Sequence, residues 1–131
     1  PAALPPRAAP TPRPALGLCG AVVTCASCRR GLSSAARGNF PCGARGGAAA
    51  VTAVASSVKV LKGAENLTLY TWGTHTAQHY FCKTCGIYTH HRRRANTAEC
   101  GVNLGAIEGA EPWALEPLPY TDGINHPSDR D

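Results

Sequence analysis

Two C-x-x-C pairs are the residues of this chain with the clearest chemical meaning. Cys82 and Cys85 lie in "HYFCKTCGIYTHH", and Cys25 and Cys28 lie in "VTCASCRR". Two thiols at this spacing can point at one metal ion, and Zn²⁺ takes four ligands in a tetrahedron, with sulfur at about 2.3 Å. One pair supplies half of a structural zinc site, so two further ligands must come from elsewhere in the chain.

Two other roles are open for Cys82 and Cys85. A redox-active pair normally lies at a helix N-terminus, where the thiol pKa is lowered, whereas this pair lies between two strand-like segments. Cysteines can also be small buried hydrophobes, and we expect this of Cys100, which begins a predicted strand. We favour a zinc knuckle, because Gly86 follows the second cysteine and allows a tight turn of the backbone.

Further ligand candidates are scattered along the chain. Cys19 and Cys42 stand alone, and the five histidines are spare candidates. His79 lies on a predicted strand close to the cysteine pair and could fill a gap in the ligand set. His90 and His91 are neighbours on a predicted strand and therefore point to opposite faces. We do not expect these two to bind one ion together.

Composition indicates a small, basic, intracellular domain. The chain has 131 residues, enough for one domain, and a formal net charge of +5. Arg29 and Arg30 form one basic cluster, and residues 92–94 form another. Such clusters are consistent with a solvated surface, a nucleic acid or an anionic small molecule. Seven cysteines, an odd number, without an export signal favour a reducing compartment, the cytoplasm. No segment has the roughly 18 apolar residues of a membrane span.

The periodicity predicts a mainly β, antiparallel domain with little helix. Residues 1–16, rich in proline and alanine, are expected to form a disordered tail, and residues 17–131 a single domain. Residues 19–50 lack periodicity except for "AVVTC". Strands are expected around residues 58–60, 67–72, 77–82, 87–93 and 100–107, with a turn at "GAEN" in which Gly63 and Asn66 can accept unusual backbone angles. The remaining segment, 108–131, is expected to be extended and packed through its large apolar side chains: Trp113, Leu115, Leu118 and Tyr120.

The predicted core is thin. The chain has no methionine, two tryptophans, two phenylalanines and four tyrosines. A small β domain with so little to bury often needs a metal or a disulfide to hold it together. This is a physical reason, separate from spacing, to interpret the cysteines as metal ligands.

More than half of the chain resembles a known family. The segments "KVLKGAENLTLYTWGTHTAQHYFCKTCGIYTHHRRRAN", "CGVNLGAIEG" and "LEPLPYTDGINHPSD" resemble the glutathione-dependent formaldehyde-activating enzyme family, which also includes centromere protein V. The match runs from about Val58 to the C-terminus, and residues 17–50 match poorly. The resemblance implies a β-tent fold that binds Zn²⁺ through two cysteine sites.

The resemblance also assigns ligands to both sites. The structural site would take Cys19, Cys82 and Cys85, with Gly17 standing where the family has a further cysteine. The second, catalytic site would take Cys25 and Cys28, with Val23 in place of its first cysteine, and would keep an open coordination position. Only five residues separate Cys19 from Cys25, where the family has a long strand-bearing segment, and Cys42 is an alternative ligand.

The implied activity is that of a carbon–sulfur lyase of the S-(hydroxymethyl)glutathione synthase type, which joins glutathione and formaldehyde or a related thiol and aldehyde. An open zinc position would hold the substrate thiol as thiolate. The two arginine clusters would bind the carboxylates of glutathione. The alternative is a non-catalytic zinc-stabilised binding module with a degraded active site, whose basic clusters contact an anionic partner; a nucleic acid is less favoured than a small thiol.

Overall fold

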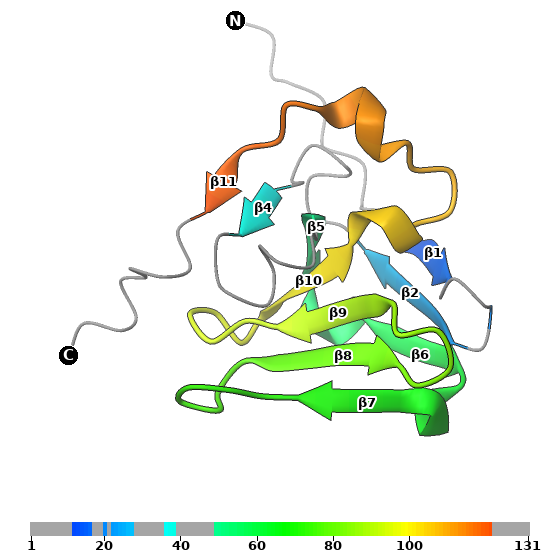
Figure 1. Cartoon of the computed structure of the whole chain (residues 1–131), viewed down its shortest axis with the longest axis vertical. Coiled ribbons are helices and arrows are strands. Elements are labelled where there is room, and N and C mark those ends of the chain that lie inside the picture. The colour runs from blue at the N-terminus through cyan, green and yellow to red at the C-terminus, as the bar shows by residue number, and fades with distance from the viewer. Residues whose placement is uncertain (1–11, 17–19, 21, 28–35, 39–48, 122–131) are drawn as a thin grey trace, which may run out of the picture.

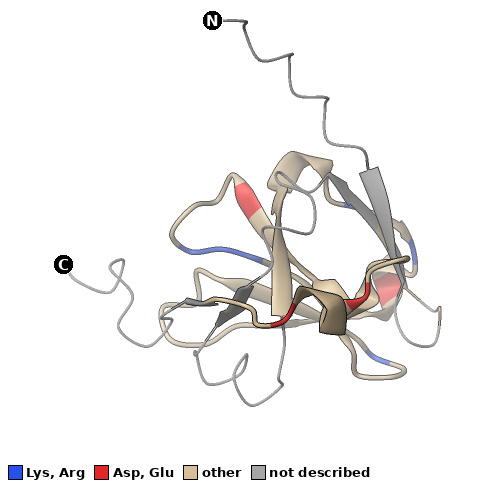
Figure 2. Cartoon of the chain, turned by 90° about the horizontal axis from the view of Figure 1, so that it is seen from above, with Lys and Arg blue, Asp and Glu red and all other residues tan. Residues whose placement is uncertain are grey.

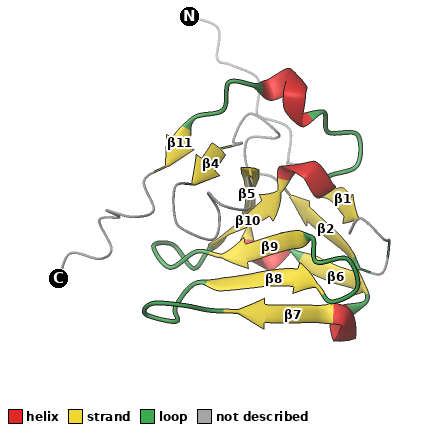
Figure 3. Ribbon diagram, in the orientation of Figure 1, coloured by secondary structure: helices red, strands yellow, loops and turns green. Residues whose placement is uncertain are grey.

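The computed structural model describes residues 12–16, 20, 22–27, 36–38 and 49–121. Over these residues the chain is mainly β, as the periodicity predicts, and its helical segments are four short 3-10 turns (Figure 3). The strands are β1 (Pro12–Leu16), β2 (Val23–Ser27), β4 (Ala36–Gly38), β5 (Ala49–Val54), β6 (Lys59–Lys62), β7 (Leu67–Tyr70), β8 (Gln78–Cys82), β9 (Tyr88–Arg92), β10 (Glu99–Asn103) and β11 (Tyr120–Thr121). The turns are η1 (Ala55–Ser57), η2 (Ala64–Asn66), η3 (Leu104–Ala106) and η4 (Pro112–Leu115).

The strands form two sheets (Figure 1). The larger sheet has the order β11-β4-β5-β10-β9-β8-β7, and all its neighbours are antiparallel except β11 and β4, which are parallel. The smaller sheet has the order β1-β2-β6 and is antiparallel. β2 also lies close to β5 and η1, so the small sheet packs beside the middle of the large one.

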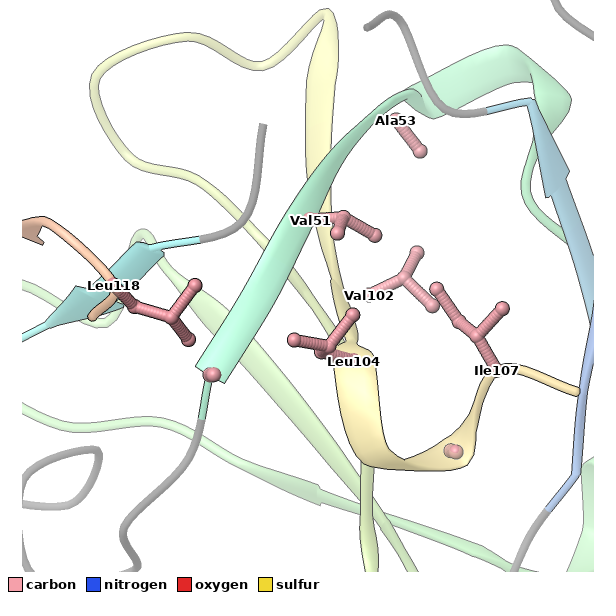
Figure 4. Packing of buried hydrophobic residues seen from close by; sticks show 8 residues of the cluster. Val51, Ala53, Val102, Leu104, Ile107 and Leu118 are labelled. Atoms are coloured by element: carbon pink, nitrogen blue, oxygen red, sulfur yellow. The ribbon is translucent and has the colours of Figure 1, made fainter. Parts of the chain in front are cut away.

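The hydrophobic core is centred on the pairing of β5 with β10. Val51 lies directly opposite Val102 in this pair, and both side chains are buried. Side chains alternate across a strand, so Ala49 and Ala53 join Val51 on the same face. Leu104, Ala106 and Ile107 follow β10 around the η3 turn, and Leu118 completes the cluster (Figure 4). Most members are alanine or valine, in keeping with the thin core expected from composition.

Three expectations about the elements need correction. Residues 12–16, assigned by composition to a disordered tail, form strand β1, whose two prolines are tolerated because β1 is an edge strand. Strand β5 was not predicted, since its alanines continue the composition of the segment before it. The C-terminal segment includes the η4 turn, and Trp113 is 74% exposed instead of packed. Leu115 and Leu118 do pack against the core as expected. The structure does not describe the side chain of Tyr120.

No helix among the described residues has the length and apolar character that a membrane crossing requires.

Candidate functional site

The Cys82–Cys85 pair lies in the turn that joins β8 to β9. Cys82 is the last residue of β8, and the turn closes through hydrogen bonds from Gly86 N to Cys82 O (2.8 Å) and from Cys82 N to Ile87 O (2.9 Å). Gly86 has φ +75°, a left-handed conformation that side chains disfavour. The strand–turn–strand setting predicted for the pair is therefore confirmed, and so is the need for glycine after it.

Asn66 connects this turn to the neighbouring strand. Its Nδ2 donates to Cys82 Sγ at 3.3 Å and to Thr84 Oγ1 at 2.9 Å, while its backbone oxygen accepts from Lys83 N at 2.9 Å. Cys82 is fully buried and Cys85 is partly buried; both are thiols. A donor aimed at a buried sulfur stabilises negative charge on that sulfur, which suits a thiolate ligand.

The role of Asn66 was missed from sequence. It was expected only as a turn residue able to accept an unusual backbone angle, and the structure assigns that property to Gly63, at φ 78°, and not to Asn66. The sequence signal that could have indicated the contact between Asn66 and Cys82 is the position of Asn66 immediately before β7. β7 pairs with β8 so that Leu67 lies opposite Cys82.

The other predicted cysteine ligands lie largely outside the described residues. The backbone of Cys25 is in β2, where it pairs with Lys59 of β6, but its side chain is not described. Cys19, Cys28 and Cys42 lie wholly outside. Within the described part of the chain, no group of three or more His, Cys, Asp or Glu side chains is arranged to hold a metal ion. The predicted ligand sets built on Cys19, Cys25 and Cys28 therefore stay predictions.

The histidines divide between the two faces of the large sheet. His90 stacks on Tyr80 and His91 stacks on His79, so the prediction that His90 and His91 face opposite ways is confirmed. His79 and Cys82 are three positions apart on β8 and so face opposite sides of the sheet. His79 is therefore not placed to fill a gap in the ligand set of Cys82, contrary to expectation.

Cys100 behaves as the expected small buried residue. It is 2% exposed and lies in β10 between Ala53 of β5 and Arg92 of β9. Burial raises the pKa of its thiol, against the opposing effect of Arg92 and Arg93. The neutral thiol is thus the stable form, and a thiolate at this position is disfavoured.

The described lysines and arginines lie at separate places along the ribbon (Figure 2). Arg93 is tied to the sheet, because its guanidinium donates to Thr52 Oγ1 at 2.9 Å and pairs with Glu99 at 3.5 Å. Arg92 is exposed at the end of β9. Arg29 and Arg30 lie outside the described residues. Of the two clusters noted in the sequence, the one at 92–94 is thus partly committed to intramolecular contacts.

Comparison with known proteins finds a solved structure that is similar to this chain in sequence and in fold. No family model matches the sequence. A crystal structure of a protein from Rhodobacter sphaeroides is 47% identical in sequence and superimposes with a TM-score of 0.80. The match covers 82% of this chain and 99% of that protein. This chain therefore belongs to the same family as the Rhodobacter sphaeroides protein.

Proposed function

We propose that this protein is a zinc-dependent carbon–sulfur lyase of the S-(hydroxymethyl)glutathione synthase type. It acts on glutathione and formaldehyde, or on a related thiol and aldehyde, in the reducing environment of the cytoplasm. The observation that supports the proposal most directly is the Cys82–Cys85 turn, with Asn66 Nδ2 at 3.3 Å from a fully buried sulfur. The resemblance of residues 58–131 to the formaldehyde-activating family supplies the activity.

The residues present fit zinc as far as they are described. Cys82 and Cys85 are soft sulfur donors in a tight turn between paired strands, and Asn66 Nδ2 donates a hydrogen bond to Cys82 Sγ, the kind of outer contact that orients a ligand. In the proposal Cys19 adds a third sulfur to this structural site, and Cys25 and Cys28 hold a second zinc. A zinc ion with an open coordination position lowers the pKa of a bound thiol, so that the thiolate exists at neutral pH.

The protein's own task is to hold both reactants so that one bond forms. The thiol of glutathione first gives its proton to water. The resulting thiolate sulfur attacks the carbonyl carbon of formaldehyde, the π electrons of C=O move to oxygen, and the oxygen takes a proton back from water, so that no net proton is gained or lost. No oxidant or reductant is required. Arg29 and Arg30 are assigned to the carboxylates of glutathione, together with Arg92, because Arg93 already pairs with Glu99.

Metal content per chain is the experiment that tests this proposal. We expect two zinc ions per chain in the purified protein. Cys28→Ser should lose one and keep the other, whereas Cys82→Ser should lose the structural ion and, with the fold that it stabilises, the second ion as well. Cys100→Ala is the matched control, because Cys100 is a buried neutral thiol, and it should keep both ions. One zinc that is lost in Cys82→Ser but kept in Cys28→Ser would instead favour the non-catalytic binding module.

Activity is measured separately from metal content. Exchange NMR of glutathione mixed with formaldehyde reports the rate of adduct formation and breakdown. The wild-type protein should accelerate exchange, Cys100→Ala should match it, and Cys28→Ser should be inactive while staying folded. A two-zinc protein without acceleration of this exchange or of exchange with other thiols and aldehydes would contradict the proposed chemistry.

A further inference from the structure

Strand β7 forms one edge of the large sheet (Figure 1). In the described part of the chain β8 is the only strand that pairs with it. Leu69 is 49% exposed and Tyr70 is 47% exposed, and side chains alternate along a strand, so large side chains on both faces of β7 reach solvent. An edge strand of this kind presents unpaired N–H and C=O groups to which another strand can bind.

The other three edge strands of the two described sheets carry features that discourage such pairing. β1 contains Pro12 and Pro14, which lack an N–H, β6 contains Lys59 and Lys62, and β11 is two residues long. Proline, lysine and short length are common means of protecting a sheet edge. β7 has the sequence LTLY, without charge or proline, and it pairs with β8 in unbroken register. Among the described edge strands, β7 is therefore the unprotected one.

The hydrogen bonds between β7 and β8 determine which backbone groups point outward. Lys83 N donates to Asn66 O at 2.9 Å, and these two residues continue the register of the two strands. Hydrogen-bonded and non-hydrogen-bonded pairs alternate in an antiparallel ladder, so Thr68 and Tyr70 also bond β8. Leu69, between them, points its N–H and C=O away from β8, toward the open edge.

We propose that β7 is the interface through which two copies of this chain form a dimer, with the two β7 strands antiparallel about a two-fold axis at Leu69. The N–H and C=O of each Leu69 then bond those of Leu69 in the second copy. Leu67 and Thr71 are both two positions from the axis, so the Thr71 N–H of each copy meets the Leu67 C=O of the other. The N–H of Leu67 needs no further acceptor, because it already donates to Ala64 O. The two large sheets thereby become one continuous sheet.

The side chains that meet across this axis suit a second copy of the same strand. Leu69 meets Leu69 on one face, and on the other face Tyr70 lies beside Thr68 of the second copy. Pairs of an aromatic and a β-branched residue stabilise antiparallel strands. Residues 66–82, which include β7, the following turn and β8, contain no Asp, Glu, Lys or Arg. No like charges therefore meet along this edge, although the whole chain has a net charge of +5.

Sedimentation velocity of the purified full-length protein, from micromolar to submillimolar concentration, measures the oligomeric state. We expect a dimer whose population rises with concentration. Leu69→Lys places two like charges opposite each other at the axis and should raise the dissociation constant about tenfold or more. Leu61→Lys is the matched control, because it makes the same change at a 61% exposed position of β6, the edge that already carries lysines. This control should leave the dissociation constant unchanged.

Amide hydrogen exchange assigns the contact to β7. The N–H groups of Thr68 and Tyr70 bond β8 and should be protected at every protein concentration. The N–H of Leu69 points outward, so it should exchange fast in the monomer and become protected as the dimer forms.

Several results would overturn this interface. One is a wild-type protein that stays monomeric at submillimolar concentration. Others are a dimer that Leu69→Lys leaves intact, or one that Leu61→Lys weakens equally. A monomer in which the Leu69 amide is nevertheless protected would show that another segment of this chain, or a co-purified peptide, covers the edge instead of a second copy. If Leu69→Lys does not fold, sedimentation and exchange of the wild type still decide the question.

Discussion

Asn66 is a side chain in direct contact with the Cys82 sulfur. Asn66→Ala removes the donors to Cys82 Sγ and Thr84 Oγ1 and should lower the free energy of unfolding by about 1 kcal/mol. Asn66→Asp should lower the free energy of unfolding further, because a carboxylate then faces a sulfur that is proposed to carry negative charge. We expect zinc affinity to fall about tenfold or more in this variant. Competition with a chromophoric chelator measures that affinity.

Thr84→Ala separates the two contacts of Asn66. It removes the hydroxyl at 2.9 Å and leaves the donor to Cys82 in place. Zinc affinity should therefore be close to that of the wild type. Equal affinities for Asn66→Asp and wild type would show that the amide has no influence on the metal.

Gly101 is needed for its lack of a side chain and not for an unusual backbone angle. In Gly101→Ala the new methyl overlaps the His91 ring, and the variant should lose about 1–3 kcal/mol of stability as the ring is displaced. Gly105→Ala is the matched control, because its methyl would meet only Asn103 Oδ1 at an ordinary 3.6 Å. We expect that control to lie within about 0.5 kcal/mol of the wild type. Urea denaturation compares the three proteins, and equal losses in both variants would contradict the seating of His91.

Packing depends most on the region where β5, β10 and η3 meet. Leu104 is fully buried, and Leu104→Ala should cost about 3 kcal/mol through lost burial and an unfilled cavity. Leu61→Ala makes the same chemical change on β6, where the side chain is 61% exposed, and should cost about 0.5 kcal/mol or less. Thermal denaturation of both variants checks this, and similar losses at the two positions would mean that the core is elsewhere.

Local patterns predict strands well where both faces of a strand differ in character. β7 to β9 follow segments of alternating or β-branched residues, and each was expected close to its observed place. β10 begins where a strand was expected but ends at Asn103, because the η3 turn replaces the rest of the expected strand. β5 could not be found this way, because Ala49, Ala50 and Ala53 carry no β propensity of their own. Its extended form depends on burial against β10, with Val51 opposite Val102. β1 was not predicted either, because its two prolines are unusual in a strand and are tolerated there only because β1 lies at the edge of its sheet.

The same limit applies to the candidate sites. The turn of Cys82 and Cys85 was predictable, because both residues and Gly86 are neighbours in sequence. The contacts of Asn66 with Cys82 and of His91 with Gly101 join separate strands, and they depend on a register that spacing alone does not determine. The β-bulge at Thr89, where the register between β8 and β9 shifts, also escapes prediction, since it is visible only as a mismatch between two paired strands.

Acid should destabilise the folded protein before its carboxylates titrate fully. His90 is buried against Tyr80, and burial, followed by the charge of Arg92, lowers its pKa from 6.5 to about 4. Between these values the unfolded chain binds a proton that the folded chain does not, so stability falls as pH decreases. The difference corresponds to about 3 kcal/mol at most for His90. Melting temperatures measured from pH 7 down to about pH 4 should decline accordingly.

His90→Phe isolates this contribution from acid release of metal. The phenyl ring can keep the stack on Tyr80, whose centroid lies 4.7 Å from that of His90, but it cannot take up a proton. The decline of melting temperature with acid should be shallower in the variant than in the wild type. Parallel curves for the two proteins would assign the acid sensitivity to other groups.

Removal of metal is expected to unfold the protein, because the core is small relative to the sheets that it supports. The buried cluster consists mostly of alanine and valine, whereas a structural zinc can contribute on the order of 10 kcal/mol to folding. A strong chelator should therefore abolish the β circular dichroism of the wild type at room temperature, and added Zn²⁺ should restore it.

Leu104→Ala provides a second test of the same expectation. With zinc bound, this variant should still fold at a lower melting temperature, and it should need less chelator than the wild type to unfold, because core and metal stabilise the same cooperative unit. A circular dichroism spectrum that a strong chelator leaves unchanged would mean that the pairing of β5 with β10 sustains the fold without the cysteines.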